Sequence, residues 1–238
     1  MDDETLQGRV RQLHTQGRST NAIVRELGVP RAQVAPVVRA IARQRQAAVP
    51  LPLPPIVGCW VNRGWSAGLA VPSDRDWPDP EAHESDTSGL AAVLVAREHP
   101  RIGGDVTVCG YLVDPYCLGV KNAMGPRAMG RKQLRRFVAA FFDGFDGAPL
   151  EAPAELARHL VWGAVAYARG LGFEPHPDFR PAAGHLGELE GPSAIGFGRD
   201  GMPYYIQGPH DDADRVLRTL DANVGLDNVH FLVQAPVG

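Results

Sequence analysis

Hydrophobic residues recur at helical spacing through the first 45 residues of the chain, with polar residues and arginines between them. Ile23 and Leu27 lie one helical turn apart, which places both side chains on the inner face of a short helix. Ser19 can cap that helix, Gly28 can form a tight turn after it, and Val34 can close a small core. The pattern predicts three helices, over residues 5–14, 20–27 and 31–45.

Beyond residue 55 the pattern changes to short apolar runs rich in β-branched and aromatic residues, which favour strands. The predicted strands cover residues 56–61, 89–97, 105–113, 194–197, 204–207 and 229–233. Apolar residues at helical spacing predict three further helices, over residues 131–142, 154–171 and 212–223. Strands and helices in this order are typical of an α+β fold with a mixed or antiparallel sheet. We therefore predict a small all-α head and a larger α+β body.

A proline-rich stretch at residues 47–55 separates the two predicted units. Closely spaced prolines disfavour a helix and favour an extended polyproline II segment, so the prediction is a head at 1–46, a linker at 47–55 and a body at 56–238. The chain carries a formal net charge of −3, yet its first 46 residues hold eight arginines against four acidic residues. A basic head on an acidic body is expected where only the head contacts a polyanion.

The composition is that of an ordinary soluble protein, with 44% hydrophobic and 21% charged residues. Its apolar runs are far shorter than the ~20 residues that a membrane-spanning helix needs. The acidic start at Asp2, Asp3 and Glu4 differs from the basic and apolar beginning of a secretion signal. Three cysteines without a Cys-x-x-Cys spacing favour reduced thiols. We expect a cytoplasmic protein with no membrane partner.

The segment from Leu6 to Arg45, with its capping Ser19 and its turn at Gly28, resembles the helix-turn-helix of homeodomain-like and resolvase-type DNA-binding segments. The resemblance implies that the third helix enters the major groove of DNA, where arginine contacts guanine or phosphate and glutamine contacts adenine. The candidate nucleic-acid contacts are Arg18, Arg31, Gln33, Arg39 and Arg43. RNA is the alternative nucleic acid. A helical module for protein contact or dimerisation is the alternative to nucleic-acid binding.

In the body, residues 121–136 gather cations around the start of a predicted helix, where the helix dipole is already positive. Each such charge costs a few tenths to ~1 kcal/mol at the surface, so an anion bound at the helix start would explain the cluster. The candidate anion contacts are Lys121, Arg127, Arg131 and Lys132. The alternative is that these side chains pair with acidic loops at residues 74–86 or 143–155.

Asp114 ends an apolar strand, a position from which carboxylates often act as bases or bind metal. Cys117 could serve as a nucleophile with Lys121 nearby, so these three residues are the catalytic candidates. The alternative is an Asp-Pro turn in which Cys117 is a small buried side chain. The candidate metal ligands, against the alternative of ordinary loop residues, are His176, Asp178 and His210. The sequence indicates no particular cofactor, because it holds no phosphate-binding loop, nucleophile elbow or His-Glu-x-x-His motif.

These patterns favour a DNA-binding protein, such as a transcriptional regulator, whose body senses a ligand or forms homo-oligomers. One alternative is an enzyme that acts on nucleic acid or a phosphorylated substrate through Asp114, Lys121 and the basic helix start. The other alternative is a protein–protein interaction module.

Overall fold

The computed structural model describes residues 3–16, 18–48, 52–78 and 89–234. The chain divides into two compact units, Met1–Pro52 and Leu53–Gly238, and the boundary falls inside the predicted linker. The elements in chain order are α1 (Asp3–Thr15), α2 (Thr20–Leu27), α3 (Arg31–Ala48), β1 (Ile56–Val61), β2 (Ala91–Glu98), β3 (Asp105–Asp114), β4 (Gly119–Gly130), α4 (Arg131–Phe141), β5 (Leu150–Glu151), α5 (Ala154–Gly170), α6 (Phe179–Leu186), β6 (Tyr204–Ile206), α7 (Ala213–Val224), the 3-10 helix η1 (Leu226–Asn228) and β7 (His230–Leu232). Among the described residues, none of the helices has both the length and the hydrophobicity that crossing a membrane requires.

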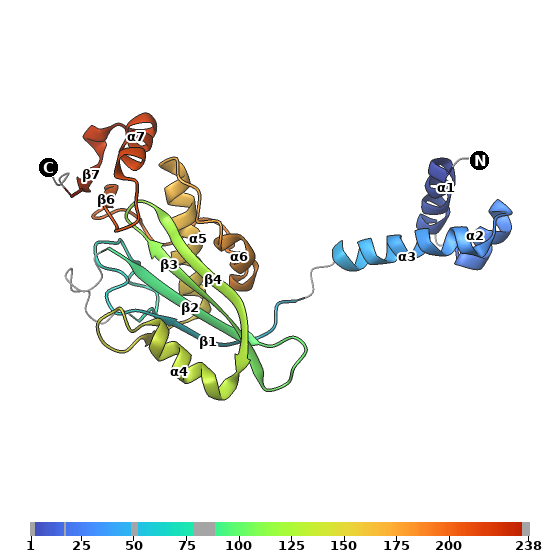
Figure 1. Cartoon of the computed structure of the whole chain (residues 1–238), viewed down its shortest axis with the longest axis horizontal. Coiled ribbons are helices and arrows are strands. Elements are labelled where there is room, and N and C mark those ends of the chain that lie inside the picture. Colours follow the sequence, from blue (N-terminus) through green and yellow to red (C-terminus); the bar gives the residue numbers. More distant parts are fainter. Residues whose placement is uncertain (1–2, 17, 49–51, 79–88, 235–238) are drawn as a thin grey trace. The chain divides into compact units, whose positions relative to one another are not determined.

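The head consists of α1, α2 and α3 packed around one small core (Figure 1). The hydroxyl of Ser19 accepts a hydrogen bond from the backbone N–H of Ala22 at 3.3 Å, which caps α2. Gly28 ends α2 in the left-handed conformation with φ of 63°, which costs glycine little because it lacks a Cβ. The three predicted helices and the predicted turn are confirmed. The third helix continues to Ala48, inside the stretch predicted as linker, and Pro36 lies within it.

Five antiparallel strands form the central sheet of the body, in the order β4-β3-β2-β1-β5 (Figure 1). Seven of the eight residues of β2 are buried, so both faces of the sheet must be covered. Val93 and Val95 point to the face covered by α5 and α6, whereas Ala92 and Leu94 point to the face covered by α4. The fold is therefore α+β, as predicted, with an antiparallel main sheet.

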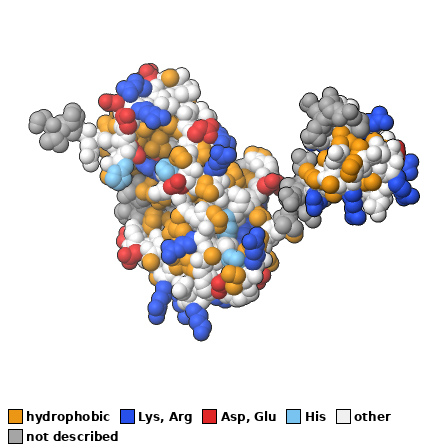
Figure 2. Space-filling model, turned by 45° about the vertical axis from the view of Figure 1, so that its right-hand side comes forward, with side chains coloured by type: hydrophobic (Ala, Val, Ile, Leu, Met, Phe, Trp, Pro, Cys, Tyr) orange, Lys and Arg blue, Asp and Glu red, His pale blue; other side chains and the backbone are white. Residues whose placement is uncertain are grey.

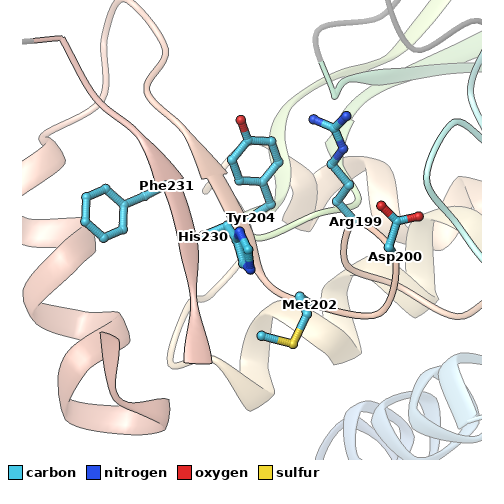
Figure 3. A pocket seen from close by; sticks show the side chains of 6 residues that line it. All are labelled: Arg199, Asp200, Met202, Tyr204, His230 and Phe231. Atoms are coloured by element: carbon cyan, nitrogen blue, oxygen red, sulfur yellow. The ribbon is translucent and has the colours of Figure 1, made fainter. Parts of the chain in front are cut away.

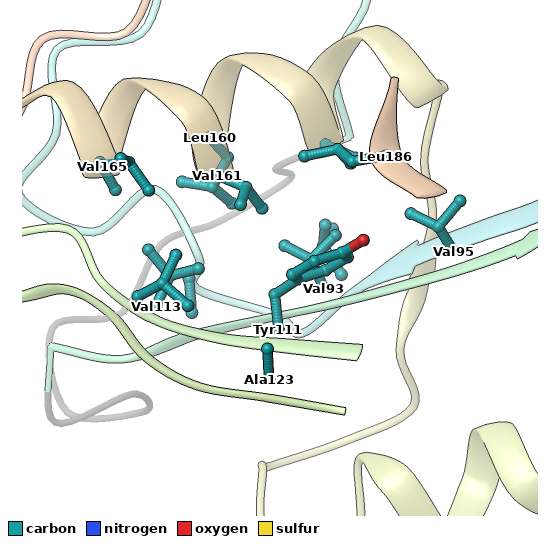
Figure 4. Close-up of a cluster of buried hydrophobic side chains, with 14 of the residues drawn as sticks. Val93, Val95, Tyr111, Val113, Ala123, Leu160, Val161, Val165 and Leu186 are labelled. Atoms are coloured by element: carbon teal, nitrogen blue, oxygen red, sulfur yellow. The ribbon is translucent and has the colours of Figure 1, made fainter. Parts of the chain in front are cut away.

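The largest core lies between the sheet and α5, where Val93, Tyr111 and Val113 face Leu160 and Val161 (Figure 4). On the other face, Gly110 of β3 allows α4 to approach closely, because a Cβ at this position would clash with the ring of Phe141. A third cluster joins α7 to the parallel pair of β6 and β7, with Tyr205 fully buried at its centre.

Four elements of the body escape the sequence prediction: β4, β5, α6 and the 3-10 helix η1. Residues 121–130, taken as the approach to a helix, form most of the edge strand β4 instead. An edge strand with one exposed side carries polar residues and lacks the continuous apolar run of β2, so its pattern is weak. The predicted strand at 194–197 is wrong, since the structure forms only an isolated bridge there between Ala70 and Gly196.

Candidate functional site

The outer surface of α3 presents the side chains of Arg31, Gln33 and Arg39, and all three are exposed. None of them makes a side-chain hydrogen bond or an ion pair within the described part of the chain. Arg18 is also exposed, and its Nε lies 4.0 Å from Oε2 of Glu26 with both side chains largely in solvent. Such a pair contributes little to stability, so it leaves Arg18 available to another anion. Arg43 belongs to α3, but its side chain lies outside the described residues.

Helical periodicity explains why α3 can present this surface. Val34, Val37 and Val38 face the head core. At 3.6 residues per turn, Ala32 and Pro36 then lie on the outward side near Arg39, and both are exposed. Small side chains beside a long arginine let a flat or grooved partner approach the helix backbone. Figure 2 shows arginine side chains, in blue, projecting from the head surface, which contains no lysine.

The four predicted anion contacts divide into two places. Arg127, Arg131 and Lys132 lie around the junction of β4 and α4, where all three side chains are exposed. Lys121 does not join them, because its Nζ donates a hydrogen bond to Oδ2 of Asp211 at 2.7 Å. No ion pair links the other three to described residues of the acidic loops, and residues 79–86 lie outside the described part.

Lys121 and Asp211 connect the main sheet to the start of α7. Asp211 also accepts the backbone N–H of Gly208 at 2.8 Å through the same oxygen. Both charged side chains are mostly buried, at 19% and 14% exposure, so this pair is a structural link between β4 and the C-terminal cluster. The hydroxyl of Tyr205 is buried in that cluster without a hydrogen-bond partner among the described residues.

Asp114 lies at the end of β3 and lines a cavity of about 290 Å³ together with Lys121 and Tyr204. Its Oδ1 accepts the backbone N–H of Tyr116 at 3.0 Å and that of Cys117 at 2.9 Å, so the carboxylate stabilises the turn into β4. Burial raises its pKa to about 6, although Lys121 and the backbone N–H groups oppose that shift. Of the two interpretations of this segment, the structure favours the Asp-Pro turn.

Cys117 is fully buried and does not line the cavity of Asp114. Burial, and next the charge of Asp114, raise the pKa of its thiol well above the ordinary value. The thiol is therefore protonated near neutral pH, which does not suit a nucleophile. The other two cysteines, Cys59 and Cys109, are also free and buried.

A second cavity, of about 420 Å³, lies beside β6 and β7 (Figure 3). The guanidinium carbon of Arg199 lies 5.2 Å from the centre of the Tyr204 ring, and His230 packs edge-on against the same ring. Met202 and Phe231 add exposed apolar surface. Sequence reasoning missed this site because β6 and β7 meet only in the folded chain and no local spacing joins them.

The candidate metal ligands do not converge. Nδ1 of His176 lies 3.6 Å from Oδ2 of Asp178. His176 and His210 line a third cavity, of about 450 Å³, but Asp178 does not. Within the described residues no group of three His, Cys, Asp or Glu side chains could hold a metal ion.

The raised pKa of Asp114 predicts a pH-dependent stability. Because its pKa is about 6 in the folded state and near 4 when unfolded, the folded chain holds the proton more tightly between these values. The stability that this tighter proton binding gives to the folded chain is present below pH 4 and is lost as the pH rises through 6. The test compares the free energies of unfolding of the wild type and of Asp114→Asn. The wild-type value minus the variant value should fall by up to roughly 3 kcal/mol from pH 4 to pH 7.

Urea titrations followed by tryptophan fluorescence measure this difference, since all four tryptophans lie in the body. Asparagine keeps an oxygen that accepts the turn hydrogen bonds, and so it isolates the titration. Burial lowers the pKa of His185 to about 4, so its contribution to the free energy of unfolding rises with pH. This contribution is the same in the wild type and in Asp114→Asn, and it cancels when the two free energies are subtracted. A difference that stays constant with pH would contradict the assigned environment of Asp114.

Comparisons with protein-family models, with curated proteins and with solved structures find no match to this chain, so its function is inferred from the geometry of its own residues.

Proposed function

We propose that the chain binds duplex DNA through α3 of its head. The observation that carries the proposal is the exposed set Arg31, Gln33 and Arg39 on a helix that follows a left-handed glycine turn. A helix in this position fits the major groove, and its side chains are of the types that contact guanine, adenine and phosphate.

Charge supports the same proposal. On α3, Arg31 and Arg39 are exposed and form no ion pair with described residues, and the contact of Arg18 with Glu26 is long. Exposed guanidinium groups gathered on so small a unit attract a polyanion, whose phosphates they can neutralise. In this proposal the protein acts in the cytoplasm as a regulator, and a ligand bound in the body could control the head.

The test compares two single substitutions in the head, Arg39→Gln on α3 and Arg9→Gln on α1. Both arginines are exposed, and both changes remove one charge. We expect Arg39→Gln to weaken binding to labelled duplex DNA by about ten-fold or more, because a bidentate contact between arginine and a base is worth about 1–3 kcal/mol. Arg9→Gln should change affinity far less. Fluorescence anisotropy over a salt series measures both.

Two results would contradict the proposal. Absence of DNA binding by the wild type at low salt would exclude it. Equal effects of Arg39→Gln and Arg9→Gln would mean that α3 is not the contact helix. Competition with duplex RNA distinguishes DNA from the alternative nucleic acid, because the deep major groove of RNA does not admit a helix.

A further inference from the structure

A second basic surface lies on the body, on α4 and the adjoining end of β4. We call it the α4 basic face and define it by Arg127, Arg131, Lys132, Arg135 and Arg136. All five side chains are exposed. The sequence prediction included only three of them, since it weighed the first turn of the helix and not its whole outer side.

The amphipathic pattern of α4 separates these cations from the core. Leu134 and Val138 are buried against the sheet, whereas Lys132 and Arg136 lie on the side of the helix away from that core and Arg131 and Arg135 lie at its margin, all four exposed. The helix contains no acidic residue, and Asp143 and Asp146 follow it in exposed positions. No ion pair joins any of the five cations to the described residues. The described residues therefore provide no ion-pair partner for these five cations, and the nearest carboxylate at the helix start is that of Asp105, beside Gly130.

Arg127 is held in place before any partner binds. Its guanidinium carbon lies 5.3 Å from the centre of the Phe137 ring, which is a cation–π arrangement. The contact costs the arginine part of its conformational freedom in the free protein, so less is lost when it contacts an anion. The planar guanidinium keeps its N–H groups for a bidentate contact with phosphate.

We propose that the α4 basic face binds the phosphate backbone of duplex DNA, and that the DNA is the same duplex that the head binds. The second clause rests on the proposed function. At 1.5 Å per residue α4 is about 16 Å long, and a duplex presents one phosphate per ~1.7 Å of axis, so several phosphates can meet the five cations. Charge complementarity with a regular polyanion favours nucleic acid. An anionic membrane is disfavoured, because the apolar side of α4 is already packed into the core.

The proposal explains why cations occupy the first turn of α4, where the helix dipole makes them unfavourable. It also gives the body a role in binding without sequence recognition, since phosphate contacts position a protein on DNA and do not discriminate bases. Contacts by two tethered units add affinity through their effective concentration.

The experiment uses the full chain in four forms: wild type, the head variant Arg31→Gln/Arg39→Gln, the α4 variant Lys132→Gln/Arg135→Gln/Arg136→Gln, and the control Arg180→Gln/Arg215→Gln/Arg218→Gln. The control removes three charges from exposed arginines of α6 and α7 that make no described ion pair. Affinity for labelled mixed-sequence duplex DNA is measured against salt concentration. Tryptophan fluorescence verifies that the body of each variant is folded.

We expect the α4 variant to lose about ten-fold or more in affinity at low salt. Its slope of log K against log salt should be smaller in magnitude by about 2–3, because each lost phosphate contact removes ~0.9. The control should match the wild type. An α4 variant that behaves as the control, while the head variant is weakened, overturns this inference and leaves the proposed function intact.

The reverse pattern, with the head variant unchanged and the α4 variant weakened, removes the proposed function and leaves the body as the DNA contact. Binding to vesicles that contain phosphatidylserine tests the alternative partner, an anionic membrane. Loss of vesicle binding in the α4 variant with no change in DNA affinity would overturn the inference in favour of a membrane surface.

Discussion

Replacement of Leu160 by alanine is expected to lower the free energy of unfolding of the body by about 3–5 kcal/mol. Leu160 is fully buried on α5 and faces the sheet residues Val93, Tyr111 and Val113 (Figure 4). The substitution removes buried methyl groups and leaves a cavity that a rigid sheet cannot collapse to fill. The loss is a large fraction of the 5–15 kcal/mol that stabilises a typical domain.

The matched control is Leu232→Ala, which deletes the same atoms from a side chain that is 60% exposed. It should change stability by no more than about 0.5 kcal/mol. Tryptophan fluorescence during urea unfolding measures both variants. A Leu160→Ala loss as small as that of Leu232→Ala would contradict the packing of α5 on the sheet.

The head was predictable because its determinants are local. The bounds of α2, the cap at Ser19 and the turn at Gly28 depend on residues within one helical turn of each other. Such signals can be recognised within a short window of sequence, without knowledge of the fold. The exposed residues of α3 follow from the same periodicity, so Arg31, Gln33 and Arg39 could be named in advance.

In the main sheet of the body, the strands that were predictable are those with long apolar runs. Strands β1, β2 and β3 carry long apolar runs because helices cover both faces of the sheet around them. The edge strand β4 has no such run. Because β4 was not predicted, Lys121 was wrongly grouped with the cations around the start of α4. Treated as loop, residues 121–131 could bring Lys121 near Arg131, but a strand rises ~3.3 Å per residue and separates them by about 30 Å.

Sites assembled from distant segments left no pattern in the sequence. Lys121 of β4 meets Asp211 only when the segment before α7 lies against that strand, and the cavity lined by Arg199 and Tyr204 forms only when β6 and β7 pair. Each contributing segment alone has the composition of an ordinary loop or short strand. The pairing depends on tertiary packing, which one sequence without its fold does not display.

The substitution Ile23→Ala is expected to separate DNA binding from the stability of the body. Ile23 is fully buried at the centre of the head core, which contains four other buried side chains. Loss of about 2–4 kcal/mol would remove much or all of the stability of so small a unit. Helix α2 has eight residues, and helices shorter than ~12 residues are marginal without tertiary packing, so the head should unfold as a whole.

We therefore expect Ile23→Ala to lose the affinity for duplex DNA that the head provides, while the tryptophan unfolding transition stays where it is in the wild type. Far-ultraviolet circular dichroism should show a loss of helix, because the head is all-helical. Ile102→Ala, at a side chain that is 53% exposed in the body, deletes the same atoms and should change neither measurement. If the α4 basic face binds phosphates, Ile23→Ala should retain weak, strongly salt-dependent binding. Wild-type affinity in a variant with an unfolded head would mean that α3 does not hold the DNA.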